Sequence, residues 1–176
     1  MKKMDVVKNR FSELYDAQSD AIFRYCLLRT SDREVALDIT QDVFVRFWDV
    51  LIKEKDVKND RAFLFTIARN LVIDWYRKKK SFSLDSMMEV DNDDLFSSVY
   101  NNTKEDIDLS TEARYVIDKI KDLEPIYHQV IYYRFVENLK PKDIAEILGE
   151  SPNVISVRIN RGMEQLRNIM GSKKDA

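Results

Sequence analysis

The stretch that decides the fold covers residues 140–167, KPKDIAEILGESPNVISVRINRGMEQLR. Its pattern predicts a short amphipathic helix over residues 141–148, which Gly149 ends. A longer helix follows, because Ser151 is a favoured cap and Pro152 suits the first helical position. Two helices joined by a short glycine-containing turn form a helix-turn-helix, a motif that many DNA-binding proteins share.

The second of these helices has two distinct sides. At 100° per residue its apolar positions share the inner side, and they are Ile155, Ile159, Gly162, Leu166 and Ile169. The candidate DNA-binding residues on the opposite side are Asn153, Ser156, Val157, Asn160 and Arg161. Amide and guanidinium groups bind base edges in a major groove, and a small apolar side chain contacts the thymine methyl group. The pattern alone fits such a helix and an ordinary helical hairpin with a polar outside, and it leaves both open.

Upstream of this segment the sequence also predicts helices. Three Gly and three Pro among 176 residues disfavour a sheet-rich fold with many tight turns, so the predicted fold class is all-α. Residues 31–34, Ser-Asp-Arg-Glu, have the pattern of a capping box that opens a helix to about residue 51. The other predicted helices cover residues 5–30 with a break near 18–20, 61–79 after a cap at Asp60, 112–123 and 125–136.

Composition excludes several classes of protein. A single cysteine, Cys26, excludes an internal disulfide framework, and a single histidine, His128, disfavours a His-rich metal site or catalytic triad. We expect Cys26 to be buried and His128 to lie in the core or at its edge. No run of eighteen apolar residues and no signal-peptide pattern occur, so neither membrane insertion nor export is expected. We find no glycine-rich phosphate loop and predict no catalytic residue, metal, cofactor or small-molecule substrate.

The charges divide the chain into three parts. Residues 81–112 contain nine acidic residues and one lysine, whereas cations outnumber acids on both sides of this segment. A polar, acidic segment without periodicity is typical of a flexible linker extended by self-repulsion. The predicted organisation is therefore a helical domain at 1–80, an acidic linker at 81–111 and a helix-turn-helix domain at 112–176.

Two helices of the first domain carry candidate contact surfaces. The helix that starts after residue 32 places an outward Trp and Val among acids, which favours a protein interface, although Trp48 could instead cover a neighbouring helix. The residues of this surface are Asp38, Gln41, Asp42, Val45 and Trp48. The helix over 61–79 carries polar groups followed by a basic run, which suits a strand of nucleic acid. Its candidate residues are Thr66, Asn70, Ile73, Asp74, Arg77 and Lys78.

Taken in order, three segments resemble those of a bacterial sigma factor of the extracytoplasmic-function (ECF) type. DITQDVFVRFW at 38–48 is similar to the helix with which that family binds core RNA polymerase. RAFLFTIARNLVIDWYRKKK at 61–80 resembles the family's −10 element helix, and residues 117–167 resemble its −35 element domain. The resemblance implies two helical domains that contact both promoter elements while bound to the polymerase.

The resemblance also implies partners and roles. Asp38, Gln41, Asp42 and Trp48 match the surface that binds the coiled coil of the polymerase β′ subunit, and Asn70 matches an Asn that helps capture a −10 base. The charged loop at 53–61 matches the loop that holds a flipped base, and the outer residues of the last helix match positions that read the −35 duplex. The family implies promoter DNA as ligand, an anti-sigma factor as a further partner, and a bacterial cytoplasmic location, associated with the nucleoid when bound to polymerase.

Three other functions compete with this interpretation. A stand-alone helix-turn-helix regulator would dimerise and bind a palindrome without polymerase. An adaptor that sequesters polymerase would bind core without starting transcription. An enzyme is disfavoured because no nucleophile has an apparent base and no paired Cys/His set occurs.

Overall fold

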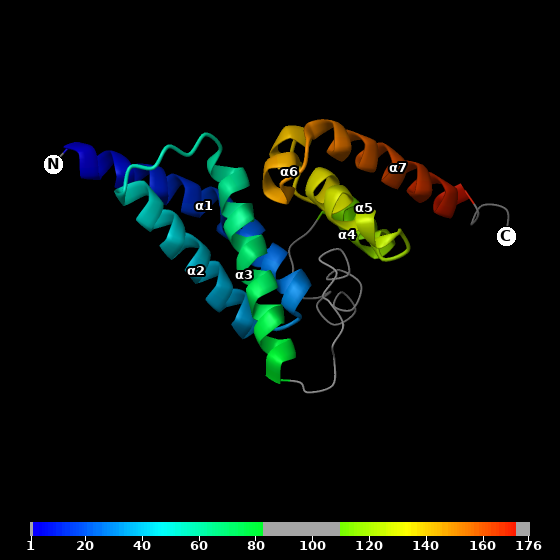
Figure 1. The fold of residues 1–176 in the computed structure, drawn as a ribbon, viewed down its shortest axis with the longest axis horizontal. Coiled ribbons are helices and arrows are strands. Elements are labelled where there is room, and N and C mark those ends of the chain that lie inside the picture. Colours follow the sequence, from blue (N-terminus) through cyan, green and yellow to red (C-terminus); the bar gives the residue numbers. More distant parts are fainter. Residues whose placement is uncertain (1, 83–109, 172–176) are drawn as a thin grey trace. The chain divides into compact units, whose positions relative to one another are not determined.

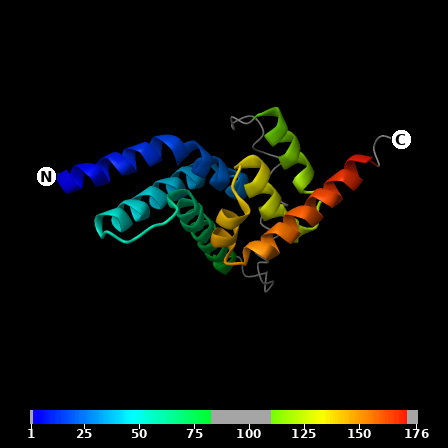
Figure 2. The same cartoon turned by 90° about the horizontal axis from the view of Figure 1, so that it is seen from above.

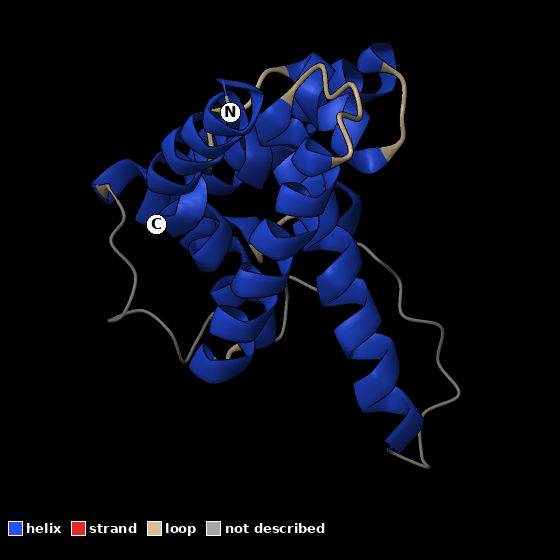
Figure 3. Ribbon diagram, turned by 90° about the vertical axis from the view of Figure 1, so that its left-hand side faces the viewer, coloured by secondary structure: helices blue, strands red, loops and turns tan. Residues whose placement is uncertain are grey.

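The computed structural model describes residues 2–82 and 110–171, and the chain divides into two compact units, residues 1–88 and 89–176. Every element within the described residues is a helix or a loop, so the predicted all-α class is confirmed (Figures 1 and 3). The predicted acidic linker falls almost wholly on residues 83–109, outside the described part. No helix in the described ranges is long and apolar enough to cross a membrane.

The first unit contains three helices that pack against one another in pairs. They are α1 (Lys2–Thr30), α2 (Arg33–Ile52) and α3 (Asp60–Phe82). A two-residue connection returns the chain from α1 to α2, so these two helices lie side by side (Figure 2). A loop over 53–59 then leads from the end of α2 to the start of α3.

Helix α1 is continuous, and the predicted break near residues 18–20 is wrong. Residues 16–20, DAQSD, are polar but contain neither Gly nor Pro, so nothing in them forces the helix to end. The polar Gln18 instead joins α1 to α3, because its Oε1 accepts a hydrogen bond of 2.9 Å from Arg61 Nε on α3.

The helix caps differ by one residue from two sequence predictions. Asp32, not Ser31, caps α2, since its carboxylate accepts from the amides of Glu34 and Val35. Before α3 the side chain of Asn59 accepts from the Ala62 amide at 3.0 Å, so the predicted cap at Asp60 is wrong. Asp60 is the first residue of α3, which frees its carboxylate for a partner on α1.

The core of the first unit draws on all three helices. Cys26 is fully buried, as predicted, and burial raises the pKa of its thiol to about 12. The neighbouring Arg29 is also buried, with its guanidinium 3.4 Å from the centre of the Tyr25 ring. The Tyr76 hydroxyl on α3 donates a hydrogen bond to the carbonyl of Arg29, which joins the end of α1 to α3. The last contact fixes the position of α3 relative to the end of α1.

The second unit contains the helix-turn-helix. Its elements are α4 (Thr111–Ile120), α5 (Pro125–Ile131), the π-helical segment η3 (Tyr132–Val136), α6 (Pro141–Leu148) and α7 (Pro152–Gly171). Gly149 ends α6 in the left-handed region at φ 67°, as the sequence predicted. The Ser151 hydroxyl accepts from the Val154 amide at 3.3 Å and opens α7. His128 is a core residue, as expected, and its Nε2 donates to the Leu123 carbonyl at 2.9 Å.

Close approach between α5 and α7 depends on Gly162. A Cβ atom at this position would lie 2.9 Å from both Cγ1 and Cδ1 of Ile131, and 3.2 Å from Cβ of Tyr127. Contacts under 3 Å force a neighbour to move, so a side chain here would separate α7 from α5. The glycine thereby sets the position of the helix that carries the predicted base-reading face.

Candidate functional site

The predicted protein-binding residues form one strip along α2. Asp38, Gln41, Asp42 and Val45 are exposed, and Trp48 is half-buried. Val45 exposes 59% of its surface although it is an aliphatic residue on a helix that packs closely on its other side. The buried side of α2 carries Ala36, Ile39, Thr40, Val43, Phe44, Phe47 and Leu51. The strip is therefore held in place by a packed core beneath it.

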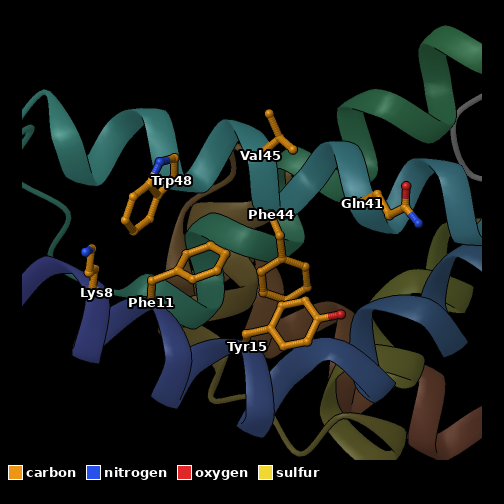
Figure 4. A pocket seen from close by; sticks show the side chains of 7 residues that line it. All are labelled: Lys8, Phe11, Tyr15, Gln41, Phe44, Val45 and Trp48. Atoms are coloured by element: carbon orange, nitrogen blue, oxygen red, sulfur yellow. The ribbon is translucent and has the colours of Figure 1, made fainter.

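A groove of about 500 Å³ lies beside this strip, between α1 and α2. Its lining is aromatic and aliphatic except for Lys8 and Gln41 at the edges (Figure 4). The lining residues are Lys8, Phe11 and Tyr15 from α1 and Gln41, Phe44, Val45 and Trp48 from α2. An exposed apolar groove beside charged side chains suits a protein partner that brings apolar side chains of its own.

Aromatic contacts shape the floor of the groove. Trp48 packs edge-on against Phe11, with the ring centres 5.1 Å apart, and Phe44 packs against Tyr15 at 4.8 Å. Figure 4 shows both α2 rings pointing toward α1, while Val45 points away from it. Trp48 therefore covers a neighbouring helix, one of the two alternatives considered for it, and it also lines the groove.

Sequence reasoning missed the α1 side of the groove. Phe11 and Tyr15 follow helical spacing, which alone does not show what they face, and Tyr15 exposes 46% of its surface. The exposed Lys8 lies one turn before Phe11, so the three residues share a face of α1. That periodicity was readable from the sequence, but the partner helix opposite it was not.

The predicted nucleic-acid face of α3 is only partly exposed. Asn70, Asp74, Arg77 and Lys78 are exposed, whereas Thr66 is half-buried and donates its hydroxyl to the Ala62 carbonyl at 2.9 Å. The carboxylate of Asp74 lies 3.9 Å from the Arg77 guanidinium, a weak pair that competing phosphates can replace. Helix α3 thus offers an exposed amide, Asn70, near a group of exposed cations.

The expected outward position of Ile73 is wrong, because only 9% of its surface is exposed. Helix α3 contacts both α1 and α2, so its buried arc is wider than the stripe of a helix with one neighbour. At 100° per residue Ile73 lies about 20° from Thr66, at the boundary of that arc. Ile73 lies in the core beneath the exposed residues and is not itself accessible to a ligand.

The basic end of α3 is partly ordered by its own aromatic residue. Lys79 Nζ lies 4.9 Å from the centre of the Trp75 ring, a cation–π contact on the helix surface. Tyr76, which binds the Arg29 carbonyl, sits directly before Arg77. The cations therefore follow a segment that is attached to the core.

The loop over 53–59 is held against α1 by Arg10. Its guanidinium donates to both carboxylate oxygens of Asp60, at 2.9 and 2.6 Å, and Nη2 approaches the Val57 carbonyl at 3.5 Å. The hydrogen bond to Asp60 raises the pKa of Arg10, so this group keeps its charge. A cavity of about 420 Å³ separates the loop from α1. Its lining consists of Val6, Val7, Arg10, Leu51, Glu54, Lys55, Asp56 and Val57.

The predicted DNA-reading face of α7 is available in the second unit. Asn153, Val157, Asn160 and Arg161 are exposed, Ser156 is half-buried, and Val157 exposes 47% of its surface. The opposite side of α7 buries Ile155, Ile159, Gly162 and Leu166, as predicted, whereas Ile169, predicted on the same side, is only half-buried. Arg158 pairs with Glu150 at 3.1 Å and joins α7 to the preceding turn. The face is thus displayed by a helix that is fixed on its other side.

Family models match both units. The Sigma-70 region 2 model matches residues 14–82, and the Sigma-70, region 4 model matches residues 113–166. The first match contains the α2 strip, the loop and the α3 face, and the second contains all five predicted residues of α7.

Whole-length relatives agree with these matches. The chain is 31% identical over 173 residues to the ECF RNA polymerase sigma factor SigW of Bacillus subtilis, covering 95% of this chain and 91% of SigW. It is 24% identical over 175 residues to the RNA polymerase sigma factor YlaC of the same organism, covering 99% and 98%. A solved structure of the sigma factor RpoE from Bartonella quintana, in complex with the anti-sigma factor NepR, has the same fold. Its TM-score is 0.63 at 19% identity, with 92% of this chain and 97% of that chain covered.

Proposed function

The chain belongs to the ECF family of RNA polymerase sigma factors, and from that membership we propose how its surfaces divide the work of promoter recognition. Core polymerase binds the α2 strip and the adjoining groove. The α3 face and the loop over 53–59 bind the −10 element, and the outer face of α7 reads the −35 duplex. Neither domain reads more than a few bases, so attachment of both to one enzyme raises their effective concentration on the promoter.

The observation that carries this proposal is the exposed apolar groove beside an acidic strip on α2. A helix of the β′ coiled coil that brings basic residues would pair with Asp38 and Asp42 while an apolar side chain enters between Trp48 and Tyr15. Buried aromatic anchors contribute most to such interfaces, and rim charges mainly speed association. We propose the same division here.

The −10 contacts use the unstacked form of DNA. Asn70 offers a side-chain amide to a base edge, and Arg77 and Lys78 bind phosphates next to it. The loop captures a flipped base, which costs a few kcal/mol of unstacking per step and therefore favours promoters that open readily. Asn70 and Leu71 stand where primary sigma factors carry a Trp pair, so we expect weak melting and strict promoter requirements.

On this proposal the chain performs no catalysis itself, because RNA synthesis belongs to the polymerase that it directs. Its place of action is the bacterial nucleoid, where promoter DNA lies. An anti-sigma factor is a further partner, as the relative from Bartonella quintana was solved with one. Since the groove is apolar and exposed in the free chain, such a factor is expected to compete with core polymerase for Val45 and Trp48.

Transcription in vitro tests the proposal. The purified chain is combined with core polymerase and a pool of random promoters, and the start sites are sequenced. We expect the chain to bind core and to select promoters with two separated elements. Binding to core without any start would instead indicate an adaptor, and a shift of duplex DNA without polymerase would indicate a stand-alone regulator. The double variant Gln41→Ala with Trp48→Ala should reduce core binding in a pull-down.

A further inference from the structure

The loop over 53–59 is held at its two ends: the amides of Lys53, Glu54 and Lys55 donate to carbonyls of α2, and Asn59 caps α3. Its sequence is KEKDVKN, in which Val57 is the one apolar residue, so burial of side chains cannot fix its shape. A site that selects one base needs its contacting atoms positioned within about 0.5 Å. The middle of the loop, around Val57, is therefore where a contact from another helix can do most to fix its shape.

Arg10 of α1 contacts this loop at Val57 and the first residue of α3, Asp60, which lies fifty residues later in the chain. The guanidinium binds Asp60 through two parallel hydrogen bonds, at 2.9 and 2.6 Å, and Nη2 points toward the Val57 carbonyl. Because a planar guanidinium fork has a fixed direction, these contacts define where α3 begins and where the loop turns into it. The acidic side chain of Asp56 adds a further attraction toward Arg10.

A cavity lies beside the ion pair of Arg10 with Asp60, and its shape depends on the position of the loop. One wall of the cavity is α1, with Val6, Val7 and Arg10, and the other is the loop itself. A change in the loop's distance from α1 alters the shape of the cavity and the direction of the loop's polar side chains. Arg10 is only partly exposed, and its guanidinium already forms a salt bridge with the carboxylate of Asp60.

We propose that Arg10 is a positioning residue for promoter recognition: by its fork to Asp60 it holds the loop in the shape that selects the −10 base. The proposal rests on the function proposed above for this loop. Arg10 acts through the loop, with its guanidinium directed to protein groups and not to DNA phosphates. Its replacement therefore changes which base is accepted at the −10 element and leaves −35 recognition as it is.

The test compares variants in reconstituted holoenzyme. Arg10→Gln removes the fork, and Arg10→Lys keeps the charge but offers a single ammonium group that cannot reproduce the planar fork. Arg33→Gln is the control, since it removes the same charge from the start of α2, about 30 Å along that helix from the loop. The Arg10–Asp60 pair is partly exposed, so its loss should cost only a small part of the folding free energy, and all three variants should fold, which circular dichroism checks.

Initiation is measured on promoters with each base at every −10 and −35 position. A specific base contact discriminates against the wrong base by about 5- to 150-fold. In Arg10→Gln this discrimination should fall roughly fivefold at one −10 position, and in Arg10→Lys it should fall by a smaller factor. Discrimination at −35 and in Arg33→Gln should not change. An equal loss at −10 and −35, discrimination retained by Arg10→Gln, or full restoration by Arg10→Lys would overturn the proposal. Failure of the unmodified chain to initiate would contradict the proposed function instead.

Hydrogen exchange in the free chain gives a second test that needs neither polymerase nor DNA. The amides of residues 55–58 should exchange faster in Arg10→Gln than in the unmodified chain, and at the unmodified rate in Arg33→Gln. Exchange at the unmodified rate in Arg10→Gln would show that the loop is held by other means and would refute the positioning role.

Discussion

Replacing Val45 with Ala should weaken binding to core polymerase without weakening the fold. Complete burial of a valine is worth about 1.5–3 kcal/mol, and Val45 still exposes 59% of its surface in the free chain. Binding in the groove can therefore gain about 1–2 kcal/mol from this side chain, of which alanine keeps a part. We expect a loss of about 1 kcal/mol, or a fivefold rise in Kd.

Because Val45 is exposed, its replacement separates an effect on binding from an effect on the stability of the fold. Surface substitutions usually change stability by less than about 0.5 kcal/mol, and alanine is the better helix former. The thermal unfolding midpoint should therefore stay level or rise slightly. Any loss of affinity then reports on the interface and not on the fold.

Val157→Ala is the matched control. Val157 is a valine on an exposed helix face with 47% of its surface exposed, but it lies in the second unit on the proposed DNA-reading face. Fluorescence anisotropy of labelled chain titrated with core polymerase measures both variants at one salt concentration. Val157→Ala should bind core as the unmodified chain does and should instead lower occupancy of the −35 duplex. An unchanged Kd for Val45→Ala, or an equal rise for both variants, would refute the proposed groove interface.

Four further predictions concern other parts of the molecule. Asn70→Ala should lower run-off transcription by roughly fivefold or more at unchanged core affinity, because a base-edge amide is lost. Arg161→Glu should weaken −35 occupancy by about 1–3 kcal/mol, and a footprinting titration that detects no change would contradict its role. Gly162→Val should lower the unfolding midpoint through about 1–3 kcal/mol of overpacking against Ile131, whereas Gly171→Val, with nothing within 4 Å, should not. Cys26 should resist thiol reagents at pH 8, where a pKa of about 12 leaves roughly one thiolate in ten thousand, and should react on unfolding.

The helices could be predicted because their signals are local. Gly149, Ser151 and Pro152 mark the turn between α6 and α7 within a few residues, and the apolar period fixes the buried side of α7. The same reasoning placed the α2 strip on the outer side of its helix, where four of its residues are exposed and Trp48 is half-buried. Local periodicity is therefore sufficient for a helix that has one packed side.

The errors arise where contacts join distant residues. Ile73 was placed outward because periodicity does not reveal that α3 has two neighbours. The groove was missed because its floor forms only when Phe11 meets Trp48, and the Arg10–Asp60 pair joins residues that nothing in the sequence connects. Each of these features depends on how α1 packs against the rest of its unit.

The hydrogen bond from Tyr76 to the Arg29 carbonyl has a consequence for how the first unit meets DNA. It attaches α3 to the core immediately before Arg77 and Lys78, so the helix backbone that carries these cations is held in place. Binding of a phosphate there does not require a flexible backbone segment to become ordered, so the loss of backbone entropy on association is small. The position of the helix backbone that carries these cations is thus settled during folding.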